Sequence, residues 1–190
     1  DLAKQGGIFH EAMRFRGLGA GHRLAWLDER LATRAPGDWA APLDDGLPRD
    51  PLFLVGFPRS GTTLLESALD SHPGLDSLDE RPALEHAIAM LKAEACPTPQ
   101  SLSGLAMPQL HGARAAYWRK VAGYLARTPA GRLIDKYPLH LGRAPYIARL
   151  FPQSAYVLLL RHPCDCVLSC YMQNFGLNGG VLSFSTLDVA

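Results

Sequence analysis

The segment from Pro51 to Thr63, which reads PLFLVGFPRSGTT, decides the fold of this chain. Its first part, residues 52–55, is a short apolar run of the kind found in buried parallel strands. Its second part begins at Gly56 and has the G-x-x-x-x-G spacing of a phosphate-binding loop between a strand and a helix. Such a loop directs several backbone N–H groups and a helix N-terminus at one anion. We therefore expect a strand, an anion-binding loop and a helix in succession.

The loop departs from the Walker motif at one position. That motif requires Lys and then Ser or Thr after the second Gly, but Thr62 stands in the Lys position. An NTPase uses this Lys on the β- and γ-phosphates and the hydroxyl on magnesium. Here the loop instead contains Arg59 and is followed by two hydroxyl side chains. The sequence therefore predicts a cradle for a shorter anion with a different charge.

Composition and charge exclude several classes of protein. The 190 residues suit one domain, and 47% hydrophobic and 19% charged residues are ordinary for a soluble globular protein. The net charge of +1 gives no global basic field, so we expect neither nucleic acid nor an anionic membrane as partner. No apolar run approaches the ~20 residues of a membrane span, and the N-terminal DLAKQGG lacks a signal-peptide core. These features predict a cytoplasmic location and leave the oligomeric state open.

Three cysteines, Cys164, Cys166 and Cys170, fall within seven residues and raise the question of a metal site. On a helix, however, the C-x-C-x3-C spacing spreads the thiols over different faces. No second Cys/His pair at zinc spacing follows. We therefore expect buried free thiols in a reducing compartment and no metal.

Strand and helix patterns alternate along the chain after the loop, which predicts a parallel sheet with helices on both faces. Residues 8–34 read helical, so residues 1–40 are expected to form a helical N-terminal extension and residues 51–190 an α/β domain. The predicted strands are 52–55, 132–136 and 155–160, and the predicted helices are 62–71, 82–95, 108–127, 139–151 and 163–175.

Basic residues follow the predicted strands. Arg59 comes after the first strand, Lys136 ends the second and Arg161 comes after the third. In parallel sheets, ligands bind outside the carboxyl ends of the strands. One such residue could simply extend into solvent, but three at consecutive strand ends favour a shared site for a polyanion.

Two segments resemble sulfotransferases that use 3′-phosphoadenosine 5′-phosphosulfate (PAPS) as donor. PLFLVGFPRSGTTLLESALDSHP, residues 51–73, is similar to their 5′-phosphosulfate loop. LIDKYPLHLGRAPYIARLFPQSAYVLLLRHPCDCVLSCYMQNF, residues 133–175, is similar to the segment that holds the donor's 3′-phosphate. The resemblance is nearer to bacterial sulfotransferases that often follow tetratricopeptide repeats, and more distant to tyrosylprotein sulfotransferases. It implies a P-loop-like α/β fold, a nucleotide donor and an acceptor hydroxyl or amine.

The resemblance also implies donor-binding residues, position by position. The 5′-phosphosulfate would be held by Arg59, Ser60, Gly61, Thr62 and Thr63. The 3′-phosphate would be held by Arg161 and Ser169.

For catalysis, the family places its general base in an acidic pair after the loop helix, here Asp79 and Glu80. We favour Glu80, because tyrosylprotein sulfotransferases place the base 21 residues after the loop Arg. Lys136 matches a lysine that contacts the bridging oxygen of the donor, and Arg59 would also stabilise charge on the leaving phosphate. The resemblance implies no metal.

The residues also allow other interpretations. Glu80 could complement the dipole of the helix that follows it, Lys136 could be a surface charge, and Ser169 could bond back to a carbonyl within its helix. Relatives often read R-D-P-R-D where this chain has RHPCD from Arg161, so the second Arg is missing. Relatives also continue beyond the point matching Ala190, so we expect the domain to be C-terminally incomplete. The alternative functions are an impaired sulfotransferase-like interaction protein and a degenerate P-loop kinase.

Overall fold

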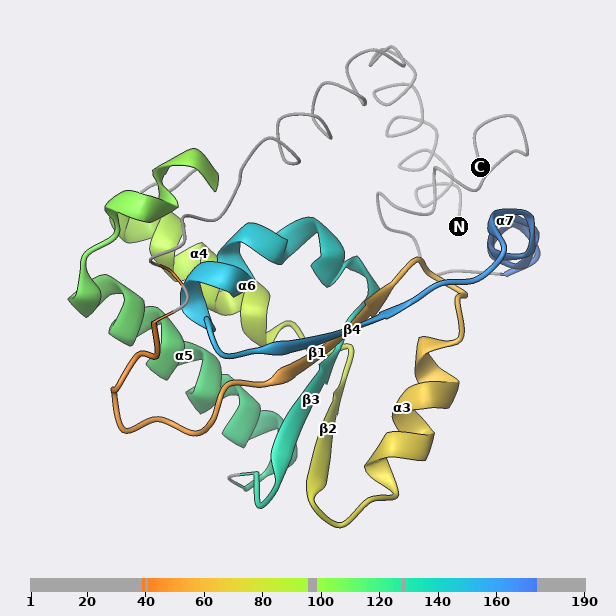
Figure 1. Ribbon diagram of the computed structural model, residues 1–190, viewed down its shortest axis with the longest axis horizontal. Helices are drawn as coiled ribbons and strands as arrows, with labels where there is room; N and C mark the ends of the chain where they lie inside the picture. The colour runs from red at the N-terminus through yellow and green to blue at the C-terminus, as the bar shows by residue number, and fades with distance from the viewer. Residues whose placement is uncertain (1–38, 40, 96–98, 128, 174–190) are drawn as a thin grey trace, which may run out of the picture. The chain divides into compact units, whose positions relative to one another are not determined.

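Four parallel strands form the sheet in the part of the chain described by the computed structural model, which comprises residues 39, 41–95, 99–127 and 129–173 (Figure 1). The order across the sheet is β2-β3-β1-β4. Residues 33–160 form one compact unit, and helix α7 (Pro163–Tyr171) belongs to a second unit. The strands are β1 (Leu52–Gly56), β2 (Leu75–Asp79), β3 (Arg132–Lys136) and β4 (Ala155–Leu159).

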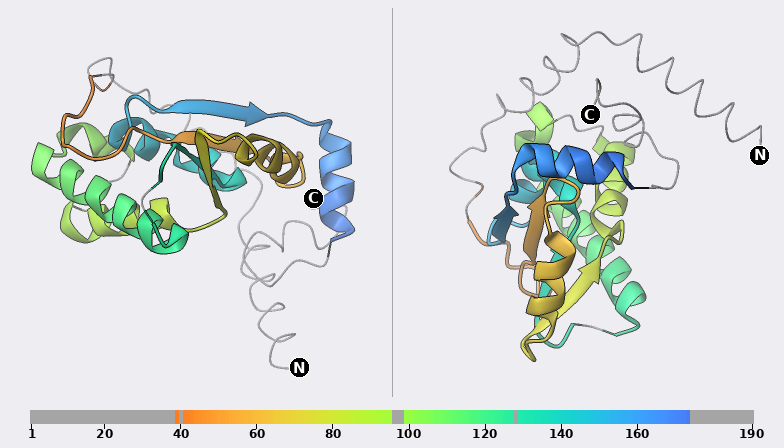
Figure 2. Two further views of the ribbon diagram at one scale, coloured as in Figure 1. Left: turned by 90° about the horizontal axis from the view of Figure 1, so that it is seen from below. Right: turned by 90° about the vertical axis from the view of Figure 1, so that its right-hand side faces the viewer.

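Helices cover both faces of this sheet. Successive side chains of a strand point to opposite faces, and β3 shows the result at its end. Asp135 accepts a 2.7 Å hydrogen bond from the Tyr117 hydroxyl on one face, whereas Lys136 contacts Glu66 on the other. Tyr117 lies on α5 and Glu66 on α3, so these two helices lie on opposite faces (Figure 2). The helices of this unit are α3 (Thr62–Asp70), α4 (Ala83–Ala95), α5 (Met107–Leu125) and α6 (Ala144–Leu150), with 3-10 helices η2 (Pro99–Gly104) and η3 (Pro138–Arg143).

The predicted parallel sheet with helices on both faces is confirmed. All three predicted strands are present, and four of the five predicted helices match α3, α4, α5 and α7, with shifts of a few residues at their ends. The predicted helix at 139–151 is wrong as a single element: it is η3 followed by α6. Pro145 lies in the first turn of α6, where it lacks the N–H needed to continue a helix from residue 141. The predicted extension of residues 1–40 lies outside the described residues except for Trp39.

Strand β2 was not predicted from the sequence. Its segment, LDSLD, combines two leucines with Asp and Ser, which are uncommon in strands. It pairs with β3 along its whole length, with Leu78 opposite Asp135 and Asp79 opposite Lys136. The acidic pair noted in the sequence therefore lies at the end of a strand.

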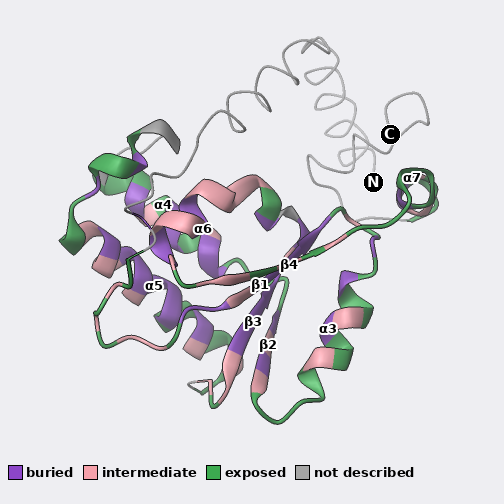
Figure 3. Ribbon diagram, in the orientation of Figure 1, coloured by how far each residue is buried: buried purple, intermediate pink, exposed green. Residues whose placement is uncertain are grey.

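The hydrophobic core lies between the sheet and α4, α5 and α6. Phe53 and Leu133 enter it from β1 and β3, and the ring of Tyr117 contacts Phe151 edge-on at 4.8 Å between centroids. Figure 3 shows that β1 and β3 are buried over most of their length, whereas β4 alternates between exposed and half-buried residues. The core thus supports β1, the strand that leads to the loop at Gly56, and its neighbour β3. In the part of the chain that the structure describes, no helix has the length and apolar character needed to cross a membrane.

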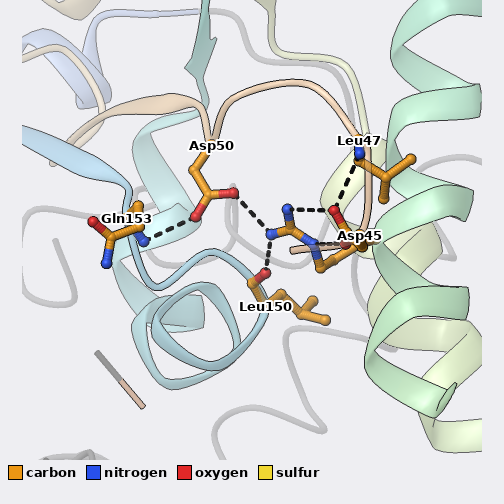
Figure 4. A network of polar contacts seen from close by, with 6 residues as sticks. Asp45, Leu47, Asp50, Leu150 and Gln153 are labelled. Atoms are coloured by element: carbon orange, nitrogen blue, oxygen red, sulfur yellow. Dashed lines mark hydrogen bonds and ion pairs between the residues drawn. The ribbon is translucent and has the colours of Figure 1, made fainter. Parts of the chain in front are cut away.

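A buried ion cluster ties the segment before β1 to α5 and α6 (Figure 4). The Arg114 side chain, on α5, donates from Nε to Asp45 at 2.5 Å and from Nη1 to Asp50 at 2.8 Å and to the Leu150 carbonyl at 2.5 Å. Asp50 also accepts a 2.8 Å hydrogen bond from the backbone of Gln153. Because all three charged side chains are at most 5% exposed, each depends on its partners for compensation. The cluster fixes the entry of the chain into β1.

This cluster predicts a loss of stability in acid. Burial raises the pKa of Asp45, but hydrogen bonds from Arg114 and from the backbone of Leu47 outweigh burial and hold that pKa below its ordinary value of 3.8. The unfolded chain therefore protonates Asp45 at a higher pH than the folded protein does. The stabilisation is fully present above pH 3.8 and is lost as the pH falls through the lower, folded pKa.

We predict that Asp45→Asn lowers the free energy of unfolding by about 3 kcal/mol near neutral pH, because it removes one partner of a buried ion pair. The variant should also lose less stability than the wild type below pH 3.8. Urea unfolding over a pH series measures both effects. Asp44→Asn, at the exposed neighbouring residue, is the matched control and should behave as the wild type. Parallel acid profiles for Asp45→Asn and wild type would contradict the prediction.

Candidate anion-binding and catalytic site

The ends of three neighbouring strands bring the predicted loop, acidic pair and lysine to one edge of the sheet (Figure 1). Lys136 at the end of β3 is in register with Asp79 of β2 on one side and with Leu54 of β1 on the other. The loop then starts at Gly56, two residues after Leu54. Arg59 therefore follows the strand that pairs with the strand of Lys136. A shared polyanion site for Arg59, Lys136 and Arg161 stays a prediction.

The backbone of the loop between β1 and α3 makes it a candidate anion-binding site. Arg59 has φ of 68° and Gly61 has φ of 104°, so left-handed residues lie on both sides of Ser60. The Ser60 N–H closes a turn by donating to the Phe57 carbonyl at 3.1 Å. Left-handed residues in a loop can turn neighbouring N–H groups toward one side, as in the backbone concavities that bind anions. A left-handed Arg is strained, and such strain is concentrated at functional sites.

Helix α3 begins directly at this loop. Its first main-chain bond runs from the Leu65 N–H to the Gly61 carbonyl at 3.2 Å. The N–H groups before Leu65 in the first turn therefore have no acceptor within the helix. Together with the helix dipole, they favour an anion at this end. Thr62 is buried and Thr63 is exposed, so the two hydroxyl residues differ in their access to solvent.

Two small residues pack closely inside the loop. A Cβ atom on Gly56 would lie 2.7 Å from the Ser60 Oγ atom and 2.8 Å from the Leu159 carbonyl oxygen, so only Gly fits. The Ser60 hydroxyl is buried and has no hydrogen-bond partner among the described residues. Buried hydroxyl groups nearly always have a partner, so this one is a candidate to bind a ligand.

The ammonium group of Lys136 is surrounded by three carboxylates. Its Nζ atom lies 3.2 Å from Glu66 Oε2 and 3.0 Å from Glu80 Oε1, and it also contacts Asp79. Burial lowers the pKa of Lys136, but the hydrogen bonds that its ammonium group donates to Asp79 and Glu80, together with the charges of Glu80 and Glu66, outweigh burial, so the pKa is raised. Lys136 is 1% exposed, so its interpretation as a surface charge is wrong.

The three carboxylates differ in their access to solvent. The side chains of Asp79 and Glu80 are 68% and 53% exposed, whereas that of Glu66 is 7% exposed. Glu80 also has a left-handed backbone, with φ of 46°, and its N–H donates to the Lys136 carbonyl at 2.9 Å. Its side chain can therefore reach both Lys136 and a molecule in solvent.

Asp135, which precedes the lysine, lies on the opposite face of β3. Its carboxylate accepts hydrogen bonds from Tyr117 and lies 3.2 Å from His140 Nε2. Burial, together with the charge of Asp135, raises the pKa of Tyr117 well above its ordinary value. Asp135 is fully buried, and its contacts with Tyr117 and His140 support the end of β3.

The predicted 3′-phosphate residues lie in the second unit. Arg161 Nε is 3.8 Å from Asp165 Oδ2, and Ser169 is half-buried on α7. Their joint binding of a nucleotide with the loop stays a prediction. On the same helix, Cys166 and Cys170 are free and buried, as predicted. Cys164 is free but exposed, so the prediction of burial is wrong for this thiol. Among the described residues, no group of three or more His, Cys, Asp and Glu side chains is arranged to hold a metal.

Two residues that contribute to the site were not predicted from the sequence. Glu66 comes from α3, and Ser77, which donates a hydrogen bond to Glu66, comes from β2. A signal for Glu66 was present: it lies four residues after Thr62, on the same face of a helix that packs on the sheet.

Three known proteins illustrate what the chain is similar to. It is 30% identical to an uncharacterised protein of Aquifex aeolicus over 71% of this chain and 18% of that protein. It is 32% identical to protein-tyrosine sulfotransferase 2 of Gallus gallus over 58% of this chain and 30% of the relative. It is 31% identical to nodulation protein NoeE of Sinorhizobium fredii over 58% of this chain and 28% of the relative. The chain thus spans less than a third of the length of each.

A protein-family model gives a match over most of the chain. The model describes the sulfotransferase family, and it matches residues 51–189, which include the loop, the acidic pair, Lys136 and α7. The chain therefore belongs to the sulfotransferase family.

Proposed function

We propose that this chain transfers a sulfuryl group from PAPS to an acceptor hydroxyl or amine by in-line displacement. The observation that supports this most strongly is the position of the anion cradle beside Lys136 and Glu80 at one sheet edge. A cradle alone would suit many phosphate ligands. A buried cation and a solvent-accessible carboxylate next to it supply what group transfer requires.

The residues of the loop fit the 5′-phosphosulfate. The first N–H groups of α3 and the guanidinium of Arg59 would neutralise its charge. The Ser60 hydroxyl, which has no partner among the described residues, would gain one. Gly61, Thr62 and Thr63 complete the set, and Arg161 and Ser169 are proposed for the 3′-phosphate from their match to the family. When bound, the donor supplies a sulfuryl group attached to a phosphate leaving group.

Glu80 is the proposed general base. Its carboxylate is half exposed and would accept the proton of the acceptor hydroxyl as the new bond forms. Lys136 stays protonated, because its carboxylate neighbours raise its pKa, and it can donate to the oxygen that leaves the sulfur. Arg59 adds a second positive charge at the loop. Positioning and charge stabilisation are the main contributions to such a transfer, and these two cations provide them without a metal.

The acceptor and the cellular location stay open to experiment. The name of the Gallus gallus relative specifies protein tyrosine as its acceptor, so a tyrosine peptide is the first acceptor to test, followed by sugars, lipids and small phenols. The cytoplasmic location stays a prediction. The two alternatives are a partner-binding protein without catalysis and a kinase. Thr62, buried and uncharged in the position of the Walker Lys, argues against the kinase.

We predict that adenosine 3′,5′-bisphosphate, the product of the donor, raises the melting temperature of the chain. A ligand that binds only the folded state at ~100 times its Kd stabilises by about 2.7 kcal/mol, or roughly 5–10 °C for a chain of this size. Arg59→Asn should weaken binding at least about tenfold, because it removes a charged hydrogen-bond donor but tolerates a left-handed backbone. Arg119→Asn, on an exposed position of α5, makes the same charge change and should bind normally.

Differential scanning fluorimetry and calorimetric titration measure these effects. No shift at millimolar bisphosphate would contradict donor binding. A shift with ATP and magnesium, but not with the bisphosphate, would instead support a kinase.

We predict that Glu80→Gln lowers the rate of transfer from radiolabelled PAPS to an acceptor by about 10²-fold or more, because a general base is lost. Its affinity for the bisphosphate should stay unchanged. Asp79→Asn, in the same acidic pair, is the matched comparison and should retain most activity. If Asp79→Asn has the larger effect, the base is Asp79. If neither variant changes a measurable transfer rate, the catalytic roles are wrong.

A further inference from the structure

We propose that Glu66 is a positioning residue that holds the ammonium group of Lys136 at a fixed place relative to the anion-binding loop. The role of Lys136 in transfer rests on the proposed function. The placement of Lys136 by Glu66 does not, because it follows from contacts within the protein.

The contacts of Glu66 link three elements. Its Oε2 atom lies 3.2 Å from Lys136 Nζ at the end of β3, and its Oε1 atom accepts a hydrogen bond from the Ser77 hydroxyl on β2. Glu66 itself is on α3, the helix that begins at the loop. The Ser77 backbone N–H donates to Asp70 at the end of α3 at 3.0 Å, so β2 holds the helix at a second point. One carboxylate thus joins the loop helix to Lys136.

Glu66 places a carboxylate on the face of α3 that packs against the sheet, where packing alone would favour an apolar side chain. Thr62 and Glu66 are the buried residues of α3, so the face of the helix that contacts the sheet is polar at its centre. A helix that packs on a sheet normally places apolar residues there. Burying a carboxylate costs free energy unless it is paired and hydrogen-bonded. Both oxygens of Glu66 have partners, and one partner is the proposed catalytic lysine.

The difference in exposure separates the three carboxylates by role. Asp79 and Glu80 are more than half exposed, and Glu80 must turn toward the acceptor to take its proton. Glu66 is 7% exposed and fixed by Ser77, so it stays with Lys136 throughout. The lysine then keeps a counter-charge and a position when Glu80 acts. Because α3 starts at the loop, the same helix sets the distance between Lys136 and the bound anion.

The first test measures Lys136 directly and needs no substrate. Acylation with a small amine reagent over a series of alkaline pH values, read by mass spectrometry, reports the neutral fraction of each lysine multiplied by its access to the reagent. Because Lys136 is 1% exposed, its acylation is compared between variant and wild type and not with that of other lysines. Lys92 and Lys120 are exposed internal references for the reagent dose. Glu66→Gln should increase acylation of Lys136 on the order of tenfold, because loss of an opposite charge within contact distance favours the neutral amine. Glu85→Gln, on α4, breaks a partly exposed ion pair with Arg143 and should leave Lys136 unchanged.

The second test separates binding from transfer. Glu66→Gln should lower kcat about tenfold or more while the Kd for adenosine 3′,5′-bisphosphate changes less than about twofold, since the loop keeps its own contacts. A structural role alone would lower the melting temperature and leave the pH at which acylation of Lys136 is half-maximal as in the wild type, because it changes access to the reagent and not the proton affinity of the amine. Ser77→Ala should act in the same direction, with a smaller effect.

The outcomes distinguish this inference from the proposed function. Wild-type protein that transfers no sulfuryl group contradicts the proposed function, and the acylation test still decides the placement of Lys136. A folded Glu66→Gln variant with wild-type acylation of Lys136 overturns the inference. If Glu66→Gln does not fold, Ser77→Ala decides in its place, and unchanged acylation in that variant overturns the inference.

Discussion

The buried ammonium group of Lys136 is the charge around which this edge of the sheet is organised. It needs compensation, because an isolated ion in the protein interior is strongly unfavourable. Three carboxylates provide it, from α3, from the end of β2 and from the residue after β2. Each belongs to an element that carries another part of the site. The lysine therefore sets the spacing between the loop helix, the acidic pair and the strand ends.

The two ends of β1 have different roles: stabilising contacts lie at its start, and the proposed binding loop lies at its end. The chain enters β1 beside Asp50, which is fixed by Arg114 and by the backbone of Gln153. It leaves β1 at Gly56, where the loop begins. The hydrophobic core holds the middle of the strand between these two points. Because β1 is held at its entry and along its length, the strained backbone of Arg59 can be tolerated at its exit.

Local sequence predicted much of this architecture, and tertiary pairing explains the rest. The apolar run and the Gly spacing identified β1, the loop and α3, and charged residues marked the end of β3. Strand β2 was not predicted, because Ser77 and Asp79 place polar side chains on its face toward α3. In the folded protein these side chains contact Glu66 and Lys136. Glu66 was not predicted as part of the site, because a sequence does not show which lysine a buried carboxylate contacts. The roles of Arg161 and Ser169 stay predictions that rest on resemblance to the family.

A crystal structure of the protein with adenosine 3′,5′-bisphosphate would show directly whether Lys136 and the loop bind the same anion. We predict that the 5′-phosphate lies in the loop between Gly56 and Thr63, within reach of Lys136, and that Arg161 and Ser169 contact the 3′-phosphate of the same molecule. A nucleotide bound with its 5′-phosphate away from this loop, or held without Lys136 nearby, would contradict the account.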